Sequence, residues 1–355
     1  MSKKIVLTGG GTAGHVTPNM ALIPGLKENG YEIKYIGSYD GIEKKLIEEM
    51  GIDYEGISSG KLRRYLSAKN FSDPFRVIKG YNEAKKIIKE YKPNVVFSKG
   101  GFVSVPVVLA AKKYKIPVII HESDMTPGLA NKLSISAASK ICHNFPETSE
   151  YLPKGKSLLT GSPIRKELRQ GDKLAGLNMC GFTTNKPIIM VIGGSLGAVA
   201  VNEAVRGALD TLLEKYQIVH LCGKGKINSS LLNLSGYKQY EYIKNELKDL
   251  FAMSDIVISR AGANAICEIV ALRKPSILIP LSARASRGDQ ILNAASFAKQ
   301  GFSEVIEEET LTKELLINTI NSVYENRKKY INAIDSAKTT DAVQTILDLI
   351  DKTAK

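Results

Sequence analysis

The sequence predicts an α/β protein made of two tandem doubly wound parallel-sheet domains that face a cleft. Short apolar segments alternate with longer amphipathic ones along most of the chain, which is the pattern of a buried parallel sheet covered by helices. The series begins again near residue 160, where another apolar strand leads into another glycine-rich loop. Each half is therefore expected to form its own sheet, with ligands at the carboxyl ends of the strands.

The first domain, residues 1–162, contains four expected strands. Each is followed by glycine or a polar turn and then by a stretch with helical spacing of apolar residues. The linker to the second domain is expected near residues 160–165. The four strands are KKIVLT, YEIKYIG, NVVFSKG and IPVIIHE.

The second domain, residues 163–336, opens with IIMVIGGSLGAVAVNEAV, an apolar strand that leads into a glycine loop and a helix. Further strands are expected at QIVHLCG, YEYI, DIVISRAG and SILIPL. The tail, residues 311–355, is amphipathic without a strand pattern and is expected to be helical. Its last helix, about residues 337–355, is expected to pack back on the first domain.

The charge of the chain predicts a polyanionic partner. The 355 residues include 49 Lys plus Arg against 36 Asp plus Glu, a net charge of +13. Residues 61–92 supply +7 of this and also carry Leu62, Tyr65, Leu66, Phe71 and Phe75. This segment fits a patch on an anionic membrane surface, and equally a solvated basic face over a helix whose core side would be Val77, Ile78, Tyr81, Ala84 and Ile88. No nucleic-acid-binding module is recognisable, so no nucleic acid partner is predicted.

Cysteine usage and hydropathy place the expected protein in the cytosol. The four cysteines are scattered without a C-x-x-C pair, which favours small buried side chains over a metal site. The start MSKKIVLTGG has no apolar leader segment, and no run of about 18 apolar residues occurs.

The first glycine loop, GGGTAGH, predicts a site for a diphosphate. Gly9, Gly11 and Gly14 have the G-x-G-x-x-G spacing, which lets backbone N–H groups approach an anion at the start of a helix near His15. A dinucleotide site would also need an acidic residue at the end of the second strand, but that strand ends YIGSYD and Asp40 lies beyond a turn. A tight turn without a ligand is the alternative.

Two further loops have related features. GGSLGA, residues 193–198, follows a strand in the same way, and Ser195 adds a hydroxyl donor. In SKGGFVSVP, Lys99, Gly100 and Gly101 end a strand and are either a simple turn or part of the first phosphate site.

The segment SRAGANAICEIVALRKPSILIPLSARASRGDQILNA is typical of a nucleotide-sugar site. A helix beginning near Gly262 carries Glu268, whose carboxylate can accept two hydrogen bonds from a ribose diol while the helix N-terminus faces phosphate. A later loop brings Asp289, Gln290 and Asn293 to another helix start, where short polar side chains can bind sugar hydroxyls.

Eight motifs in order resemble the MurG family over essentially the whole chain. They are GGGTAGHVTP, SKGGFVSVP, IPVIIHES, GSPIR, GGSLGA, YEYI, SRAGANAICE and DQILNA. The resemblance implies a GT-B fold of two Rossmann-like domains and transfer of N-acetylglucosamine from UDP-N-acetylglucosamine to lipid I, which forms lipid II for peptidoglycan. It also implies a peripheral enzyme on the cytoplasmic face of the cell membrane, with a role in cell wall assembly, cell shape and division and with partners in those assemblies.

The resemblance also implies the site residues. Arg165 and Ser195 would contact the phosphates of the donor, the backbone of Ile243 would read uracil, and Gln290 would bind the sugar. The sequence departs from the family at Asp124, where the family has asparagine, at Ala13 and at Asp289. The donor set is Thr12, Ala13, Gly14, Asp124, Arg165, Ser195, Ile243, Ala263, Asn264, Ala265, Ile266, Cys267, Glu268 and Gln290, and the acceptor diphosphate set is Gly10, Gly11, His15, Lys99, Gly100 and Gly101.

An inverting transfer needs a base for the acceptor hydroxyl and a stabiliser for the leaving diphosphate. His15 is the first candidate base, with anion binding without proton transfer as the alternative role. Glu122 is the second, with a buried polar network as its alternative; His143 and His220 are expected to be structural. No D-x-D motif occurs, so neither a metal ion nor another cofactor is predicted.

Three rival functions stay open from the residues alone. The first is a GT-B enzyme with another nucleotide sugar, such as a glycolipid synthase. The second is a nicotinamide-dependent oxidoreductase, and the third is a basic nucleic-acid-binding protein. Binding of UDP, but not of NAD or an oligonucleotide, separates the donor-site interpretation from the last two.

Overall fold

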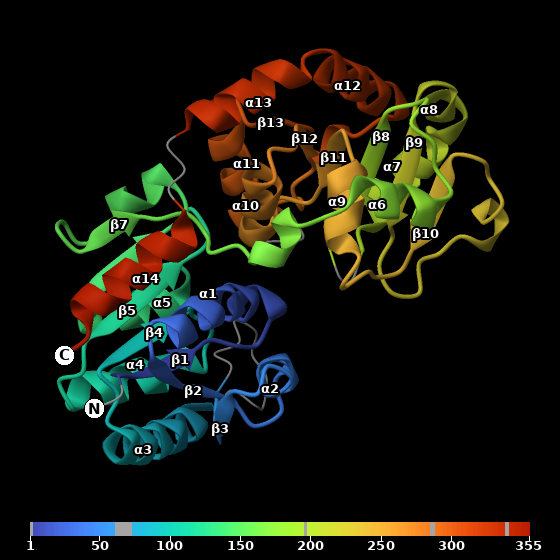
Figure 1. The fold of residues 1–355 in the computed structure, drawn as a ribbon. Helices are drawn as coiled ribbons and strands as arrows, with labels where there is room; N and C mark the ends of the chain where they lie inside the picture. Colours follow the sequence, from blue (N-terminus) through green and yellow to red (C-terminus); the bar gives the residue numbers. More distant parts are fainter. Residues whose placement is uncertain (1–2, 61–72, 195–196, 285–287, 338–340) are drawn as a thin grey trace. The chain divides into compact units, whose positions relative to one another are not determined.

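A computed structural model describes residues 3–60, 73–194, 197–284, 288–337 and 341–355 of the chain. The chain divides into two compact units (Figure 1). Unit 1 comprises Met1–Arg165 with Thr340–Lys355, and unit 2 comprises Lys166–Thr339. The boundary after Arg165 lies a few residues beyond the one expected at residue 162.

Unit 1 is built on a parallel sheet of seven strands within the described ranges. The strand order is β3-β2-β1-β4-β5-β6-β7, so the chain first builds outward from β1 in one direction and then returns to build in the other. The register pairs Ile5 with Ile33 on one side of β1 and with Val95 on the other. The strands are β1 Lys3–Thr8, β2 Tyr31–Ser38, β3 Asp53–Ile57, β4 Val95–Ser98, β5 Val118–Glu122, β6 Lys140–His143 and β7 Ser157–Leu159.

Both faces of this sheet are covered, because side chains alternate between them along each strand. Ile5 and Leu7 of β1 pack in one buried cluster with residues of α1 and α14, whereas Val6 packs in the cluster on the other face with residues of α3 and α4. The helices are α1 Thr17–Glu28, α2 Ile42–Glu48, α3 Asp73–Tyr91, α4 Ser104–Lys113, α5 Leu129–Ser134 and α14 Ala342–Thr353, with 3-10 turns η1 Ala13–His15, η3 Ile135–Ala137 and η4 Pro146–Tyr151.

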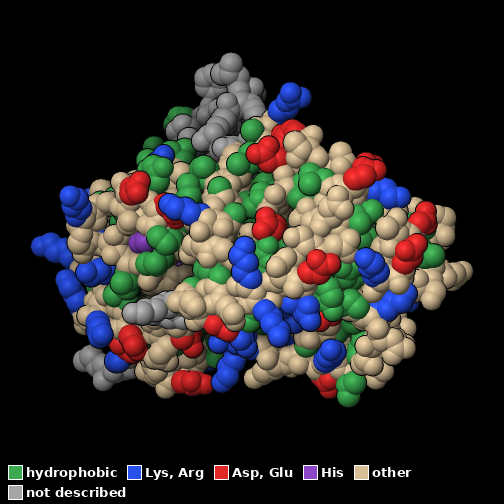
Figure 2. All heavy atoms as spheres, turned by 90° about the horizontal axis from the view of Figure 1, so that it is seen from above, with side chains coloured by type: hydrophobic (Ala, Val, Ile, Leu, Met, Phe, Trp, Pro, Cys, Tyr) green, Lys and Arg blue, Asp and Glu red, His purple; other side chains and the backbone are tan. Residues whose placement is uncertain are grey.

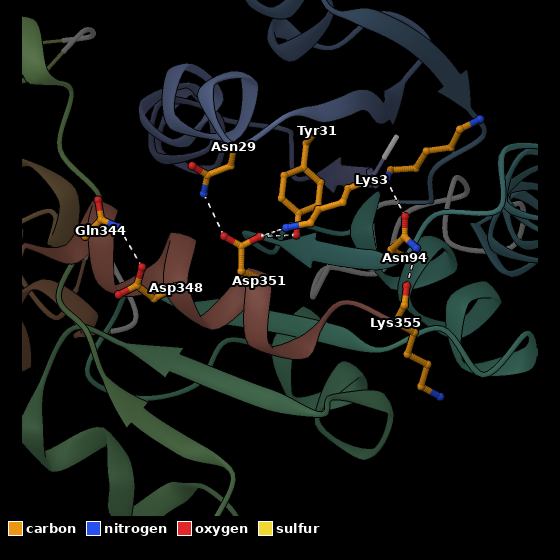
Figure 3. Close-up of polar contacts among 9 residues, drawn as sticks. Lys3, Asn29, Tyr31, Asn94, Gln344, Asp348, Asp351 and Lys355 are labelled. Carbon is orange, nitrogen blue, oxygen red and sulfur yellow. Dashed lines mark hydrogen bonds and ion pairs between the residues drawn. The ribbon is translucent and has the colours of Figure 1, made fainter. Parts of the chain in front are cut away.

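The C-terminal helix α14 belongs to unit 1, although it ends the chain. Its apolar side buries Ile346, Leu347 and Ile350 in the cluster that contains α1. On its polar side, Asp351 accepts hydrogen bonds from Lys3 Nζ at 3.0 Å, Tyr31 Oη at 2.8 Å and Asn29 Nδ2 at 2.9 Å (Figure 3).

Unit 2 repeats the same plan with six parallel strands among the described residues. The order is β10-β9-β8-β11-β12-β13. The strand expected at YEYI lies three residues earlier: β10 ends at Tyr240, and the residues from Glu241 to Ile243 follow it as irregular chain. The strands are β8 Ile188–Ile192, β9 Gln217–Leu221, β10 Tyr237–Tyr240, β11 Ile256–Ser259, β12 Ser276–Leu278 and β13 Ser303–Val305.

The largest buried cluster of unit 2 joins one face of its sheet to α7, α8 and α12. Residues two apart on the same strand, such as Ile256 and Ile258, enter this cluster together. The helices are α6 Lys173–Cys180, α7 Val199–Gly207, α8 Leu209–Lys215, α9 Leu247–Met253, α10 Ala263–Ala271, α11 Asp289–Lys299, α12 Lys313–Glu325 and α13 Arg327–Ser336, with 3-10 turns η5 Lys166–Arg169, η6 Ser229–Leu231 and η7 Glu308–Thr310.

The strand orders place a topological switch point in each unit. In unit 1 it lies between β1 and β4, and in unit 2 between β8 and β11. Ligands of open parallel sheets bind at such points, outside the carboxyl ends of the strands. The glycine loops after β1 and β8, and the turns after β4 and β11, lie there.

The basic segment 61–92 is described only from residue 73 onward, so Leu62, Tyr65, Leu66 and Phe71 lie outside the described residues. On α3, Ala84 and Ile88 are buried as expected. The expectation of a core position for Ile78 is wrong, because its side chain is 59% exposed, and Phe75 is 75% exposed. On the face shown in Figure 2, Lys and Arg side chains are interspersed with Asp and Glu.

Within the part of the chain that the structure describes, every helix is too short or too polar to cross a bilayer.

Candidate functional site

The exit of β1 is held by a buried polar network. Tyr35 Oη donates to Gly9 O at 2.6 Å, and Asn19 Nδ2 donates to Thr8 O at 3.2 Å and to Tyr35 Oη at 3.1 Å. Asn19 comes from α1 and Tyr35 from β2, so both neighbours of the strand fix the start of the first glycine loop. The loop then turns through Gly11, whose φ of +84° favours glycine.

Glu43, near the start of α2, is an acidic residue at this loop that the motif analysis missed. Its side chain is fully buried, and its carboxylate accepts from Gly11 N at 3.2 Å, Ser38 N at 3.0 Å and Ser38 Oγ at 2.5 Å. The dinucleotide pattern places its acidic residue at the end of the second strand, where this chain has YIGSYD with Asp40 beyond the turn. The carboxylate instead reaches back from the following helix.

His15 ends the short turn η1 and is partly buried beside the loop. Its Nδ1 lies 3.1 Å from Gly10 O and 3.1 Å from Thr12 Oγ1. Because a carbonyl oxygen only accepts, the contact with Gly10 assigns the proton to Nδ1 and leaves the lone pair on Nε2. Burial and the positive charge of Lys99 lower the pKa of His15 to about 4, against smaller raising effects of Gly10 and Glu43, so the ring is neutral at pH 7.

Lys99 follows β4 and is 1% exposed. Its ammonium donates to His121 Nδ1 at 2.7 Å and to Ser123 Oγ, and His121 Nε2 donates to Gly161 O at 2.9 Å. Burial, followed by the charge of Lys99, lowers the pKa of His121 well below its ordinary value. Lys99 is thus a fixed positive charge beneath the loop, with its ammonium bonded to other side chains.

Glu122, the second candidate base, organises the loop after β5. One carboxylate oxygen accepts from Ser123 N at 2.8 Å and Asp124 N at 3.0 Å, and the other accepts from Gly128 N at 2.9 Å and Asn131 Nδ2 at 2.8 Å. Burial raises the pKa of Glu122, although its hydrogen bonds oppose the shift. Both carboxylate oxygens of Glu122 thus accept hydrogen bonds. This arrangement is a buried polar network of the kind that the sequence gives as the alternative to a catalytic base.

The loops after β1 and β4 touch one another in unit 1. A Cβ on Gly101 would overlap the carbonyl oxygen of Gly10, and one on Gly9 would come within 3.2 Å of Lys99 Cβ. The residues expected to hold a diphosphate therefore share one place in unit 1, at the switch point. They are Gly10, Gly11, His15, Lys99, Gly100 and Gly101.

In unit 2, the loop after β8 passes tightly against the end of β9. Gly197 has a φ of +67°, and a Cβ there would overlap the carbonyl oxygen of Cys222. The helix α7 then begins without a side-chain cap at Ala198. Ser195, expected to contact the donor, lies outside the described residues.

The helix α10 begins at Ala263, as expected, after an N-cap glycine that provides no side-chain cap. Glu268 lies in its second turn and is half-buried. Gln290, in the first turn of α11, accepts from Leu281 N at 3.0 Å through Oε1, which places it beside the loop after β12. Asn293 is fully buried and donates to Ala261 O at 3.3 Å, and its binding of sugar hydroxyls stays a prediction.

Ile243 and Arg165 are further residues expected to bind the donor, and His143 and His220 are the histidines expected to be structural. Ile243 follows the end of β10 and is half-buried. Arg165 ends the first segment of unit 1, and its buried Nε has no hydrogen-bond partner among the described residues. His143 Nδ1 donates to Phe145 O at 2.8 Å, and His220 lies between Tyr237 and Asn202.

Two family models match the chain. Residues 5–143 match the N-terminal domain of glycosyltransferase family 28, and residues 188–350 match the C-terminal domain of the same family. The first match contains the switch point of unit 1 and the second contains that of unit 2.

Curated relatives are similar over the full length. A protein of Lachnoclostridium phytofermentans is 67% identical over 350 residues, which cover 99% of each chain. A protein of Lachnospira eligens is 63% identical over 353 residues, which cover 99% of this chain and 100% of the relative. Both are named UDP-N-acetylglucosamine--N-acetylmuramyl-(pentapeptide) pyrophosphoryl-undecaprenol N-acetylglucosamine transferase.

Solved structures agree with the fold. The crystal structure of MurG from Acinetobacter baumannii has a TM-score of 0.78 at 27% identity, with 99% of each chain covered. The calicheamicin glycosyltransferase CalG4 has a TM-score of 0.71 at 11% identity, with 99% of this chain and 98% of the other covered, and this likeness concerns the fold alone.

Proposed function

Because this chain belongs to the MurG family of glycosyltransferases, we propose that it transfers N-acetylglucosamine from UDP-N-acetylglucosamine to the lipid-linked acceptor lipid I and so forms lipid II. The observation that carries this function is the identity of 67% over 99% of the chain with a relative named for that reaction. A glycolipid synthase with the same fold would share the strand orders but not an identity of this extent and coverage.

We assign the donor to unit 2. The first turn of α10, which has no side-chain cap, offers backbone N–H groups to a diphosphate, and Glu268, in the second turn of the same helix, is the proposed acceptor of the ribose hydroxyls. We also propose Arg165 as a ligand of the donor phosphates, because the family resemblance implies that role for it. Together these groups stabilise the charge that develops on the leaving UDP.

We assign the acceptor diphosphate to the switch point of unit 1. The glycine loop presents its backbone there, and the buried ammonium of Lys99 makes the place positive. Lys99 contributes its positive charge from beneath the loop, where its ammonium donates to His121 and Ser123.

In the transfer step, His15 Nε2 accepts the proton of the acceptor hydroxyl as the oxygen attacks the anomeric carbon of the donor sugar. The bond from that carbon to the diphosphate oxygen breaks, and UDP leaves with the electron pair, so the configuration inverts. A bound diphosphate beside His15 raises the pKa of the ring from about 4 toward the operating pH, because a nearby anion favours the imidazolium.

We propose that the transfer step needs no metal ion. Backbone dipoles at helix N-termini and the guanidinium of Arg165 supply the positive charge that a cation would otherwise supply to the leaving diphosphate. Transfer is expected to continue in EDTA, and loss of transfer in EDTA with recovery on addition of Mg²⁺ would contradict this part.

We further propose that the enzyme binds the cytoplasmic surface of the membrane from the side of α3. Phe75 and Ile78 are exposed there next to Arg76 and Lys79, a combination that suits an anionic bilayer surface. Binding to vesicles that contain an anionic lipid should exceed binding to neutral ones, and Phe75→Ser with Ile78→Ser should reduce it. Equal binding to both kinds of vesicle would overturn the proposal.

The deciding experiment follows labelled N-acetylglucosamine from its UDP donor to a lipid I analogue, for the native protein, His15→Ala and Glu268→Ala. Both variants should lose transfer, with Glu268→Ala losing UDP affinity and His15→Ala retaining it. A native protein that binds UDP but does not glycosylate the analogue would refute the acceptor and leave the donor site. Absence of UDP binding would refute both.

A further inference from the structure

Glu43 occupies a slot that three glycines enclose. A Cβ on Gly10 or Gly41 would overlap its carboxylate, and one on Gly37 would lie 2.9 Å from its Cγ. The carboxylate is 0% exposed, and burial of such a group is costly unless hydrogen bonds compensate. Three donors from the Gly11 and Ser38 positions provide that compensation. The local chain is shaped to seat a carboxylate directly against the glycine loop.

One peptide group links this carboxylate to His15. Gly11 N donates to Glu43 Oε2 at 3.2 Å, and the carbonyl of the same peptide, Gly10 O, lies 3.1 Å from His15 Nδ1. Because a peptide group is planar, fixing its N–H also fixes the direction of its C=O. The Glu43 carboxylate therefore contacts the Gly10–Gly11 peptide, and this peptide contacts the His15 imidazole.

We propose that Glu43 is a positioning residue for His15, which it holds in the Nδ1–H tautomer through the Gly10–Gly11 peptide. This inference rests on the proposed function, in which Nε2 of His15 accepts a proton. A base needs its lone pair on the nitrogen that meets the substrate, and a wrong tautomer abolishes that ability without disturbing the fold.

The alternative partner of His15 shows why this control is needed. Thr12 Oγ1 also lies 3.1 Å from Nδ1, and a hydroxyl can either donate or accept. If the Gly10 carbonyl turned away, the Thr12 hydroxyl could donate to Nδ1, and the ring proton would then reside on Nε2. The Glu43 carboxylate prevents this by anchoring the peptide from its other side.

Glu43→Gln is the first test, with Glu48→Gln as the matched control. In either orientation the amide of the glutamine turns its NH₂ toward Gly11 N–H or Ser38 N–H, so one backbone donor loses its acceptor. Glu48 is exposed at the end of the same helix, and its substitution removes the same charge without contact with the loop. Glu43→Asp keeps the charge but is one methylene shorter, and it is the deciding variant.

The direct readout is the tautomer of His15 from ¹⁵N chemical shifts of the imidazole nitrogens. The chain has four histidines, and the His15 signals are those missing from His15→Ala. We expect the Nδ1–H form in the native protein and in Glu48→Gln. In Glu43→Gln we expect a mixture or the Nε2–H form, and in Glu43→Asp an intermediate population.

The kinetic readout is the split between kcat and KM. We expect Glu43→Gln to lower kcat about 10-fold to 100-fold, because an imidazole in the Nε2–H form cannot accept the proton, with the donor KM within about twofold of native. In Glu43→Gln the amide oxygen can still accept from Gly11 N when the NH₂ faces Ser38, so Glu43→Asp, which is one methylene shorter, decides. An unchanged Nδ1–H tautomer in Glu43→Asp overturns the inference, whatever happens to kcat or to the melting temperature. If the native protein transfers no sugar, the proposed function fails, and the tautomer measurement still decides the positioning role.

Discussion

His15 combines an available lone pair with a neutral ring at pH 7, and both properties come from its neighbours. The Gly10 carbonyl assigns the proton to Nδ1, and burial with the charge of Lys99 lowers the pKa to about 4. A group with so low a pKa is a weak base. The bound acceptor must therefore contribute to its basicity, because the diphosphate brings negative charge to the same loop.

This dependence predicts two different pH profiles. The acid limb of kcat/KM reports the free enzyme and should lie near pH 4, whereas the acid limb of kcat reports the bound complex and should lie at higher pH. Below each limb the imidazole is protonated and cannot accept the proton of the hydroxyl. Initial rates across pH with a soluble acceptor analogue measure both limbs.

Lys99 and Glu43 are the charged groups that act on the pKa of His15, and Lys99 gives a control for these profiles. A neutral Lys99→Met should raise the pKa of His15 and move the kcat/KM limb upward. Coincident limbs for kcat and kcat/KM in the native enzyme would show that the diphosphate does not act on His15.

At the scale of elements, the sequence predicts best where a pattern is local. The strands expected to begin at Lys3, Tyr31 and Gln217 are found there, because short apolar runs and flanking glycines mark them within a few residues. The strand β10 begins three residues before the predicted one, because YKQY is no more apolar than the YEYI that was predicted instead. The short strands β3, β7 and β13 at the sheet edges were not predicted. Glu43 was missed because its contact spans 32 residues from Gly11 and depends on the packing of α2.

Gly197 in the β8–α7 turn gives a prediction about an element boundary. Gly197→Ala places a Cβ against the Cys222 carbonyl at a φ of +67°, which should cost about 1–3 kcal/mol of unfolding free energy and weaken UDP binding. Urea unfolding and UDP titration measure the two effects. Gly207→Ala is the control, because a Cβ at that end of α7 meets nothing within 4 Å. Equal stability of the two variants would contradict the close approach.

The contact of α14 with β1 and β2 predicts a pH-dependent stability. Partial burial opposes ionisation of Asp351, but hydrogen bonds from Lys3, Tyr31 and Asn29 outweigh it and lower its pKa. A lowered pKa in the folded state stabilises the fold above the ordinary value of 3.8, and this contribution disappears as the pH falls through the folded-state pKa.

Asp351→Asn should therefore lower the melting temperature at pH 7, and the difference from native should shrink below about pH 4. Asp348→Asn is the control, since Asp348 accepts a hydrogen bond from Gln344 Nε2 of the same helix (Figure 3). A difference that stays constant from pH 7 to pH 3 would argue against the ionised carboxylate as its source.

At the scale of the whole molecule, each unit has its own sheet and its own buried clusters, so a ligand of one unit should stabilise that unit selectively. UDP is expected to slow amide hydrogen exchange in α10 and α11 and to leave α1 and α14 unchanged. Exchange measured by mass spectrometry over peptides of both units tests this. Protection in α1 and α14 with none in α10 would move the donor site to unit 1.

Unit 1 is interrupted in the chain: its sheet comes from the first 165 residues, but α14, from Ala342 to Thr353, completes one of its faces. On the ribosome, the residues that finish this face are translated after all of unit 2. The half that is synthesised first is thus completed last, and unit 2 can fold while Leu22 and Leu26 of α1 still lack the covering that Ile346 and Ile350 provide. A message truncated just before α14 would release a chain with a finished second half and an uncovered first half, a substrate for chaperones and proteases.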